Sequence, residues 1–304
     1  MNALGIDAGG SSTKWVVVDG AGQMLETGRV APLGGHLYSA DSRGKARDVV
    51  ESLQSNIAGC APRVALAGVT GLTKGSEQAV WLEQTMTEVF HLERCAVIGD
   101  MDLAYRAHYQ PGEGIVLYAG TGSIAYHITQ QLEVKRAGGR GYLIDDAGGG
   151  YWIGQQALRW MVRQLDAGLS ADDPLSSAVL QRIGSSDWDA VRAYVYAGDR
   201  SVVSSLAPLV GAAAQQGSAE AGRILEMAGI ELADLAQRLK AQVGELPVTT
   251  VGGAWQVSPL IADAARNSGL AFTPSSVDIA LAAAHLALEL DSEHEYREHQ
   301  SADR

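Results

Sequence analysis

Two glycine-rich turns, each lying between two strand-like runs, constrain the fold of this chain more than any other feature. The first turn, residues 5–14, reads GIDAGGSSTK, and the second, residues 117–123, reads LYAGTGS. β-Branched and aromatic residues are frequent on both sides of each turn, which predicts hairpins. Glycine, serine and threonine let backbone N–H groups converge on an anion without a Cβ in the way, and the hydroxyls add donors. Two such turns are suited to holding the two ends of a polyphosphate.

The residues that follow the first turn exclude two familiar nucleotide-binding loops. A dinucleotide-binding loop or a P-loop runs from a strand into a helix, whose N-terminus holds the phosphate. Here residues 15–18 (WVVV) continue as strand, and the Gly-Lys-Ser/Thr ending of a P-loop is missing. The pattern therefore predicts a strand–turn–strand phosphate site, with an ordinary tight hairpin as the alternative.

Size and charge limit the classes of protein to which the chain can belong. Its 304 residues are 46% hydrophobic, enough for two domains with sizeable cores. A net charge of −12 argues against a nucleic-acid or anionic-membrane surface. The N-terminus enters a strand directly, and no run approaches the roughly 18 apolar residues of a membrane span. We therefore expect a soluble, cytoplasmic protein with no nucleic-acid or membrane partner.

The order of predicted elements repeats once along the chain. Before a break at 111–114, the expected elements are strands at 4–6, 13–18 and 24–30, a helix at 41–58, a strand at 64–68, a helix at 76–89, a strand at 95–98 and a helix at 101–109. After it, they are strands at 115–118, 124–128 and 133–136, a helix at 151–165, an alanine-rich helical region at 175–244, a strand at 248–251, and helices at 259–267 and 275–290.

This repeat predicts an α/β fold in which βββαβα occurs twice. Meander strands that later pair with βα units give a mixed sheet with helices on both faces. We expect an N-terminal lobe at 1–112 and a C-terminal lobe at 113–304, the latter carrying a helical insertion. The polar tail from 291 to 304 is expected to fray.

Two aspartates stand at predicted strand ends, where sites form in such sheets. Asp7 ends the first strand inside the glycine turn, and Asp100 follows the strand at 95–98. Asp100 is a candidate general base, and its alternative role is the N-cap of the next helix. Asp102 is a nearby competitor for the base. The two cysteines, Cys60 and Cys95, form no metal motif, and Cys95 lies in an apolar run.

The duplicated order, the two turns and a late Gly-Gly-Ala turn at 252–254 together resemble the actin/hexokinase/Hsp70 ATPase superfamily. Within it, the chain is most similar to the BadF/BadG/BcrA/BcrD ATPase group, above all to its N-acetylglucosamine kinases. The resemblance covers nearly the whole chain. It implies a duplicated βββαβα actin-like, ribonuclease H-like fold with two lobes around a cleft. The implied activity is ATP-dependent phosphorylation of the 6-hydroxyl of an amino sugar, N-acetylglucosamine first, with glucosamine as an alternative.

The resemblance also implies roles for individual residues in ATP and Mg²⁺ binding. Asp7 would hold Mg²⁺, usually through water, and Asp100 would accept the proton of the sugar hydroxyl. The first turn would hold the β- and γ-phosphates, the second would meet them from the other lobe, and the third would face the adenosine. These nucleotide-binding residues are Gly9, Gly10, Ser11, Ser12, Thr121, Gly122, Gly252, Gly253 and Ala254. The last turn is also compatible with a simple strand-to-helix connection.

The sugar site is expected in the loop at 137–152, where N-acetylglucosamine kinases carry Gly-Gly-Trp-Gly and then Gly-Asp-Glu-Gly-Ser. This chain departs from that pattern: Arg140 replaces the tryptophan, Asp145 replaces a glycine, and residues 147–149 read AGG. Arg140 would pair with Asp145 or bring charge to a more anionic substrate. The residues expected to bind sugar are His36, Asp100, Ser123, Gly139, Arg140, Gly141 and Asp146. For His36 a surface-loop position is the alternative.

Two other functions agree with parts of the pattern. The same ATPase group includes dimeric activators of 2-hydroxyacyl-CoA dehydratases, which share a [4Fe–4S] cluster through two cysteines per subunit, and this chain has two cysteines. A catalytically silent sugar sensor would keep the fold without turnover, but Asp7 and Asp100 are both present. For the kinase, the resemblance implies a homodimer.

Overall fold

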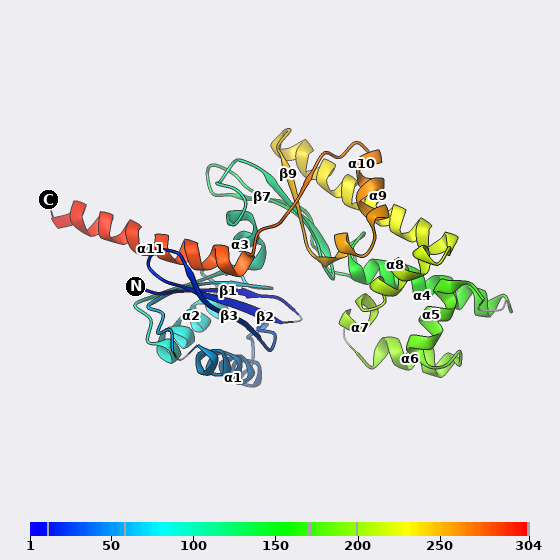
Figure 1. Cartoon of the computed structure of the whole chain (residues 1–304), viewed down its shortest axis with the longest axis horizontal. Coiled ribbons are helices and arrows are strands. Elements are labelled where there is room, and N and C mark those ends of the chain that lie inside the picture. The colour runs from blue at the N-terminus through cyan, green and yellow to red at the C-terminus, as the bar shows by residue number, and fades with distance from the viewer. Residues whose placement is uncertain (11, 58, 169–171, 199, 303–304) are drawn as a thin grey trace. The chain divides into compact units, whose positions relative to one another are not determined.

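The computed structural model describes residues 1–10, 12–57, 59–168, 172–198 and 200–302, which form two compact units. The first unit combines Met1–His108 with Ser276–Arg304, and the second is Tyr109–Ser275. Each contains one five-stranded mixed sheet with helices packed on it (Figure 1). The predicted duplication of a three-strand meander followed by parallel strands is confirmed.

The sheet of the first unit is formed by five strands in the spatial order β3-β2-β1-β4-β5. They are β1 (Ala3–Ala8), β2 (Thr13–Val18), β3 (Met24–Val30), β4 (Val64–Val69) and β5 (Arg94–Gly99). β1 pairs antiparallel with β2 and parallel with β4, and β5 extends the parallel part. The parallel strands β1, β4 and β5 therefore end at the same edge of the sheet.

Four helices cover the two faces of this sheet: α1 (Ala40–Asn56), α2 (Glu77–Phe90), α3 (Asp100–Arg106) and α11 (Ile279–Ala302). Leu4, Ile6 and Ala8 of β1 face the core made with α1 and α2. The opposite face is buried against α3 and α11. Residues 279–290 of α11 thus pack on the sheet of the first unit, whereas the sequence places them in the second lobe.

Gly5 explains how α11 reaches the sheet so closely. A Cβ on Gly5 would lie 2.1 Å from the carbonyl oxygen of Ala280 and 2.2 Å from the backbone nitrogen of Ala284. Helix packing therefore requires this glycine, although in the sequence it is the first residue of the glycine-rich segment 5–14.

We expect Gly5→Ala to lower the free energy of unfolding by about 3 kcal/mol, because the methyl group overlaps backbone atoms that cannot rotate away. Gly44→Ala on α1 is the control, since nothing lies within 4 Å of its Cβ position. That control should gain up to about 1 kcal/mol from helix propensity. Denaturant unfolding measures both variants, and equal stability of Gly5→Ala and the parent would contradict the packing.

The second unit repeats the arrangement with the strand order β10-β9-β6-β7-β8. Its strands are β6 (Ile115–Ala119), β7 (Ser123–Ile128), β8 (Val134–Gly138), β9 (Val248–Val251) and β10 (Thr273–Pro274). Its helices are α4 (Gly150–Asp166), α5 (Pro174–Ile183), α6 (Trp188–Tyr196), α7 (Arg200–Ser204), α8 (Ala207–Gln215), α9 (Ala219–Val243), the 3₁₀ helix η1 (Gly253–Gln256) and α10 (Pro259–Asn267).

The helical region predicted at 175–244 is a set of separate helices. Asp173 caps α5 with Pro174 in its first turn, and Gly184 ends that helix in the left-handed conformation. The long helix α9 buries Leu225, Leu232 and Leu239 in the core of the second unit. The predicted apolar periodicity of this helix is confirmed.

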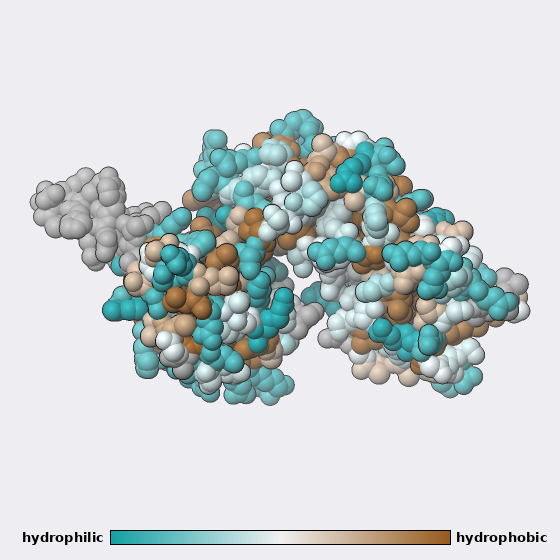
Figure 2. All heavy atoms as spheres, in the orientation of Figure 1, coloured by the Kyte–Doolittle hydropathy of each residue, from teal (hydrophilic) through white to brown (hydrophobic). Residues whose placement is uncertain are grey.

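The surface is mixed in character. In the view of Figure 2, hydrophilic side chains cover much of each unit, and hydrophobic ones form separate small patches. None of the helices in the described part of the chain combines the length and the apolar character needed to cross a membrane.

Candidate active site

Asp7 and Asp100 lie at the same edge of the first unit's sheet. Asp7 is paired in register with Gly68 of β4, and Gly68 with Ile98 of β5. Asp100 follows β5 immediately and opens α3. The negative charge of Asp100 is one of the causes that raise the pKa of Asp7, so the two carboxylates influence each other.

The pKa of Asp7 is raised to about 6, first by burial and then by the charges of Asp100 and Asp278. Lys14 and Arg29 oppose this shift. Asp7, Lys14 and Arg29 occupy one cross-strand row, because Asp7 pairs with Lys14 and Lys14 with Arg29. A carboxylate whose charge is disfavoured in this way is a site to which a cation would bind favourably.

The two cations of this row are directed to other partners. Lys14 Nζ lies 2.6 Å from Asp278 Oδ2, in the segment that leads into α11. Arg29 Nη1 donates to Ser12 Oγ at 3.1 Å. The first glycine turn thus lies beside one arginine and one lysine. The sequence analysis assigned a role to neither residue.

Asp100 is the first residue of α3, and the N-cap position belongs to Gly99. The alternative role of Asp100 as N-cap is therefore wrong. One oxygen, Oδ1, accepts from the N–H of Met101 at 2.9 Å. The competitor Asp102 forms an ion pair with Arg106 one turn along the same helix.

The first turn is closed by a hydrogen bond from the N–H of Gly9 to the carbonyl of Ser12, at 3.1 Å. Among the described residues, the nearest atom to a Cβ on Gly9 would be that same carbonyl at 3.5 Å, so no described side chain covers this backbone face. Gly10 is exposed and Ser12 half-buried. Ser11, also expected to bind phosphate, lies outside the described residues.

His36 lies near the carboxyl end of β4. The N–H of its neighbour Gly35 donates to the carbonyl of Thr70 at 2.9 Å, directly after that strand. The His36 ring is exposed, and it would be 3.8 Å from a Cβ on Gly71. The structure therefore brings His36 to the strand edge at which Asp7 and Asp100 lie.

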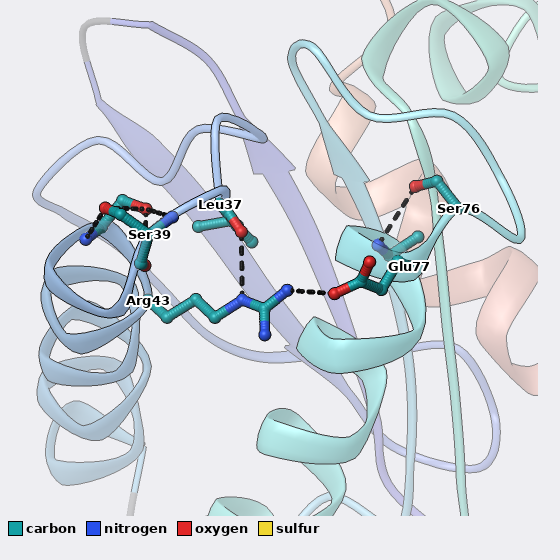
Figure 3. A network of polar contacts seen from close by, with 7 residues as sticks. Leu37, Ser39, Arg43, Ser76 and Glu77 are labelled. Atoms are coloured by element: carbon teal, nitrogen blue, oxygen red, sulfur yellow. Dashed lines mark hydrogen bonds and ion pairs between the residues drawn. The ribbon is translucent and has the colours of Figure 1, made fainter.

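A network of polar contacts holds the His36 segment (Figure 3). Arg43 Nε donates to the carbonyl of Leu37 at 3.0 Å, and Nη2 donates to Glu77 at 2.7 Å. Ser39 and Ser76 cap the helices α1 and α2 on which Arg43 and Glu77 stand. One arginine thus ties both helices to the chain beside His36.

In the second unit, Asp146 is the residue around which the expected sugar loop and the second turn are built. It is 5% exposed and has a φ of +66°. Its carboxylate accepts hydrogen bonds from the backbone N–H groups of Ser123 and Gly141. Its pKa is raised, mainly by burial, with Asp145 adding to the shift and Arg200 opposing it.

The same carboxylate explains why the second turn contains Gly122. A Cβ there would lie 2.4 Å from Asp146 Oδ2. Two hydrogen bonds also fix the turn to the start of α4. The N–H of Gly150 donates to the carbonyl of Gly120 at 2.8 Å, and the N–H of Tyr151 donates to the carbonyl of Thr121 at 2.9 Å. Ser123 Oγ donates to the carbonyl of Ala147 at 2.7 Å. The second turn and the loop at 139–150 therefore form one rigid assembly.

We expect Asp146→Ala to lower the free energy of unfolding by about 2 kcal/mol, because two backbone N–H groups lose a charged acceptor. The same loss should raise the KM of the two expected substrates, ATP and the amino sugar. Asp145→Ala is the matched control. It should change stability by less than about 0.5 kcal/mol, since removal of Asp145 relieves repulsion. Thermal unfolding and steady-state kinetics measure both effects. If stability and both KM values stayed at parental levels, Asp146 would not organise this assembly.

The third turn follows β9. Gly252 has a φ of +107°, and its Cβ would lie 2.3 Å from the carbonyl oxygen of Ala119, so it allows β9 and β6 to end side by side. Gly253 is exposed with nothing within 4 Å of its Cβ position, whereas Ala254 is 4% exposed and belongs to the core. Open backbone for a ligand is thus available at Gly253, and Ala254 points its side chain inward.

Four charged residues near these turns were missed by the sequence reasoning: Lys14, Arg29, Arg200 and Asp278. Lys14 and Arg29 were accessible in principle, because the hairpin register places them opposite Asp7. Arg200 and Asp278 are far from their partners in the sequence, and no local pattern indicates them.

Comparison with known proteins supports the fold. A candidate N-acetylglucosamine kinase from Chromobacterium violaceum is 27% identical, with a TM-score of 0.75 over 94% of this chain and 98% of that one. Another from Porphyromonas gingivalis is 19% identical, with a TM-score of 0.78 over 94% of this chain and 99% of that one. These likenesses confirm the expected actin-like α/β fold.

Sequence relatives point the same way. An N-acetylmuramic acid/N-acetylglucosamine kinase from Clostridium acetobutylicum is 26% identical over 192 residues. That match spans 61% of this chain and 62% of the relative, less than two thirds of its length. The model of the BadF/BadG/BcrA/BcrD ATPase family matches residues 4–266, and this chain therefore belongs to that family.

Proposed function

We propose that this protein is an ATP-dependent kinase that phosphorylates the 6-hydroxyl of an amino sugar, N-acetylglucosamine first, with glucosamine as the alternative. The observation that carries the proposal is the meeting of Asp7 and Asp100 at one strand edge, beside an open glycine turn. Membership of an ATPase family and relatives named as N-acetylglucosamine kinases support it.

In this proposal, Gly9, Gly10, Ser11 and Ser12 bind the β- and γ-phosphates through backbone N–H groups and hydroxyls. Thr121 and Gly122 of the second turn are also assigned to phosphate binding. Gly253 presents open backbone to the adenosine, and Gly252 and Ala254 fix the turn that carries it. The negative charge of the phosphates is balanced in part by Arg29, which contacts Ser12.

Asp7 fits a role in holding Mg²⁺. Among the described residues, no three His, Cys, Asp or Glu side chains are grouped closely enough to hold a metal ion on their own. Mg²⁺ in nucleotide sites needs only one or two carboxylates, because waters and phosphates fill the other positions. A bound Mg²⁺ would neutralise developing charge on the phosphates. Such a cation would reduce the repulsion between the carboxylate of Asp7 and those of Asp100 and Asp278.

Asp100 accepts the proton of the sugar hydroxyl during transfer. The hydroxyl oxygen forms a bond to the γ-phosphorus while the bond between that phosphorus and the β–γ bridging oxygen breaks, which releases ADP. The proton moves to the Asp100 carboxylate. His36, Ser123, Gly139, Arg140, Gly141 and Asp146 orient the sugar in this proposal.

The cysteines give no support to a dehydratase activator. Burial raises the pKa of Cys95 to about 12. Burial and the neighbouring Glu26 also raise the pKa of Cys60. Within the described part of the chain, the charges that act on the two thiols are those of Glu26 and Glu83, and negative charge disfavours a thiolate ligand.

The direct test is ADP release in the presence of Mg-ATP with and without N-acetylglucosamine, glucosamine, glucose and N-acetylmannosamine. The proposal expects strong stimulation by an amino sugar and little by glucose. A rate that no sugar changes would contradict it and favour a sensor or an ATPase.

A further inference from the structure

Arg140 is held in place by a glycine on each side, and both glycines are bonded to the candidate sugar site. Gly139, with a φ of +66°, donates its N–H to the carbonyl of Ser123 at 3.0 Å. Gly141, with a φ of +96°, donates its N–H to the carboxylate of Asp146. The backbone of Arg140 is therefore fixed beside the two residues that join the second turn to the sugar loop.

The guanidinium of Arg140 is exposed and has no hydrogen-bond, ion-pair or ring partner among the residues that the structure describes. The pairing with Asp145 that the sequence allowed is not formed. Asp145 instead adds to the negative charge that acts on Asp146. The chain has a net charge of −12, yet no acidic side chain among the described residues pairs with Arg140, so its N–H donors remain available to a ligand.

The residues that follow Arg140 add apolar surface. Leu143 and Ile144 are 84% and 81% exposed, and Tyr142 packs against Tyr151 of α4 with ring centroids 4.7 Å apart. The loop therefore presents a cation and alkyl side chains together. Such a surface suits an acceptor that is larger and more acidic than a simple hexosamine.

We propose that Arg140 binds a carboxylate on the acceptor, so that the substrate class is an amino sugar carrying an acidic substituent away from its 6-hydroxyl. The planar guanidinium offers two parallel N–H donors that match the two oxygens of a carboxylate. This inference rests on the proposed kinase function and deepens it. The relative from C. acetobutylicum is named for N-acetylmuramic acid as well as N-acetylglucosamine, which makes that acid a suitable probe.

The experiment compares three acceptors with Mg-ATP: N-acetylmuramic acid, its methyl ester and N-acetylglucosamine. The ester keeps the bulk of the acid and removes its charge. The parent should show a kcat/KM for the acid about tenfold above that for the ester, the size of one charge-assisted hydrogen bond. Equal values for acid and ester, with N-acetylglucosamine phosphorylated, would overturn this inference and leave the kinase intact.

The variants Arg140→Gln and Arg140→Lys locate the effect. Arg140→Gln should lower kcat/KM for the acid about tenfold more than it lowers kcat/KM for the ester or for N-acetylglucosamine, while Arg140→Lys retains part of the preference for the acid. Arg159→Gln, on an exposed face of α4, is the control and should change nothing. An equal loss for all three acceptors would assign Arg140 to the nucleotide and overturn the inference. Phosphorylation of none of them by the parent would reject the kinase itself.

Discussion

Replacing Asp100 with asparagine is expected to lower kcat by about 10²- to 10⁴-fold, the usual contribution of a positioned general base. Asparagine keeps the shape of the side chain and an oxygen that accepts from the N–H of Met101, so α3 should start normally. It cannot take the proton of the sugar hydroxyl. Binding of ATP should survive, because Asp100 acts on the acceptor.

The matched control for this variant is Asp102→Asn, which removes a carboxylate two residues away on the same helix. Asp102 pairs with Arg106, so its loss should weaken α3 slightly and leave kcat within about threefold. Single-turnover measurements separate chemistry from product release. Near-parental turnover in Asp100→Asn, or a larger loss in Asp102→Asn, would reject Asp100 as the base.

Asp7→Asn is expected to make the nucleotide-free protein more stable while it lowers activity. The pKa of Asp7 is raised from 3.8 to about 6 in the folded protein, so the folded state disfavours the charged carboxylate. A difference of this size corresponds to about 3 kcal/mol as an upper limit at pH 8. Asparagine removes that cost, and with it the carboxylate that the proposal assigns to Mg²⁺.

The raised pKa of Asp7 also determines how the stability of the parent changes with pH. Between pH 3.8 and about 6 the folded state binds a proton that the unfolded state has released, so the stability of the parent falls as pH rises through this range. Below pH 3.8 both states are protonated, and the advantage of Asp7→Asn should disappear. Asp48→Asn, at an exposed position on α1, is the control for removal of a surface carboxylate. Denaturant unfolding at pH 3.5 and pH 8 measures the difference, and an Asp7→Asn variant less stable than the parent at pH 8 would contradict the charge balance around Asp7.

Much of the fold was predictable because its signals are local. Strand-like runs on both sides of each glycine turn predicted the two meanders. Asp7 and Asp100 were selected because each stands at the end of a predicted strand, and the structure places those strand ends at one sheet edge. The hairpin register, which places Lys14 opposite Asp7, would also have predicted the cross-strand row of charged residues that includes them.

The rest depends on contacts between residues far apart in the sequence. The packing of α11 on the first sheet requires a glycine at position 5, opposite the backbone of Ala280, and no periodicity reveals this contact. Gly122 was interpreted as a phosphate-binding glycine, yet it also makes room for the buried Asp146 carboxylate. A sequence pattern can indicate that a position requires glycine, but it does not show whether a ligand or a neighbouring side chain occupies the space beside that glycine.

The central claim is tested most directly by identifying the product. The protein is incubated with Mg-ATP and N-acetylglucosamine, and the sugar is analysed by mass spectrometry and by ³¹P–¹H correlation NMR. The account predicts a sugar monophosphate whose phosphorus couples to the protons on C6, formed in equal amount to ADP. Release of inorganic phosphate with the sugar unchanged would contradict it and identify the protein as an ATPase that does not transfer phosphate to sugar.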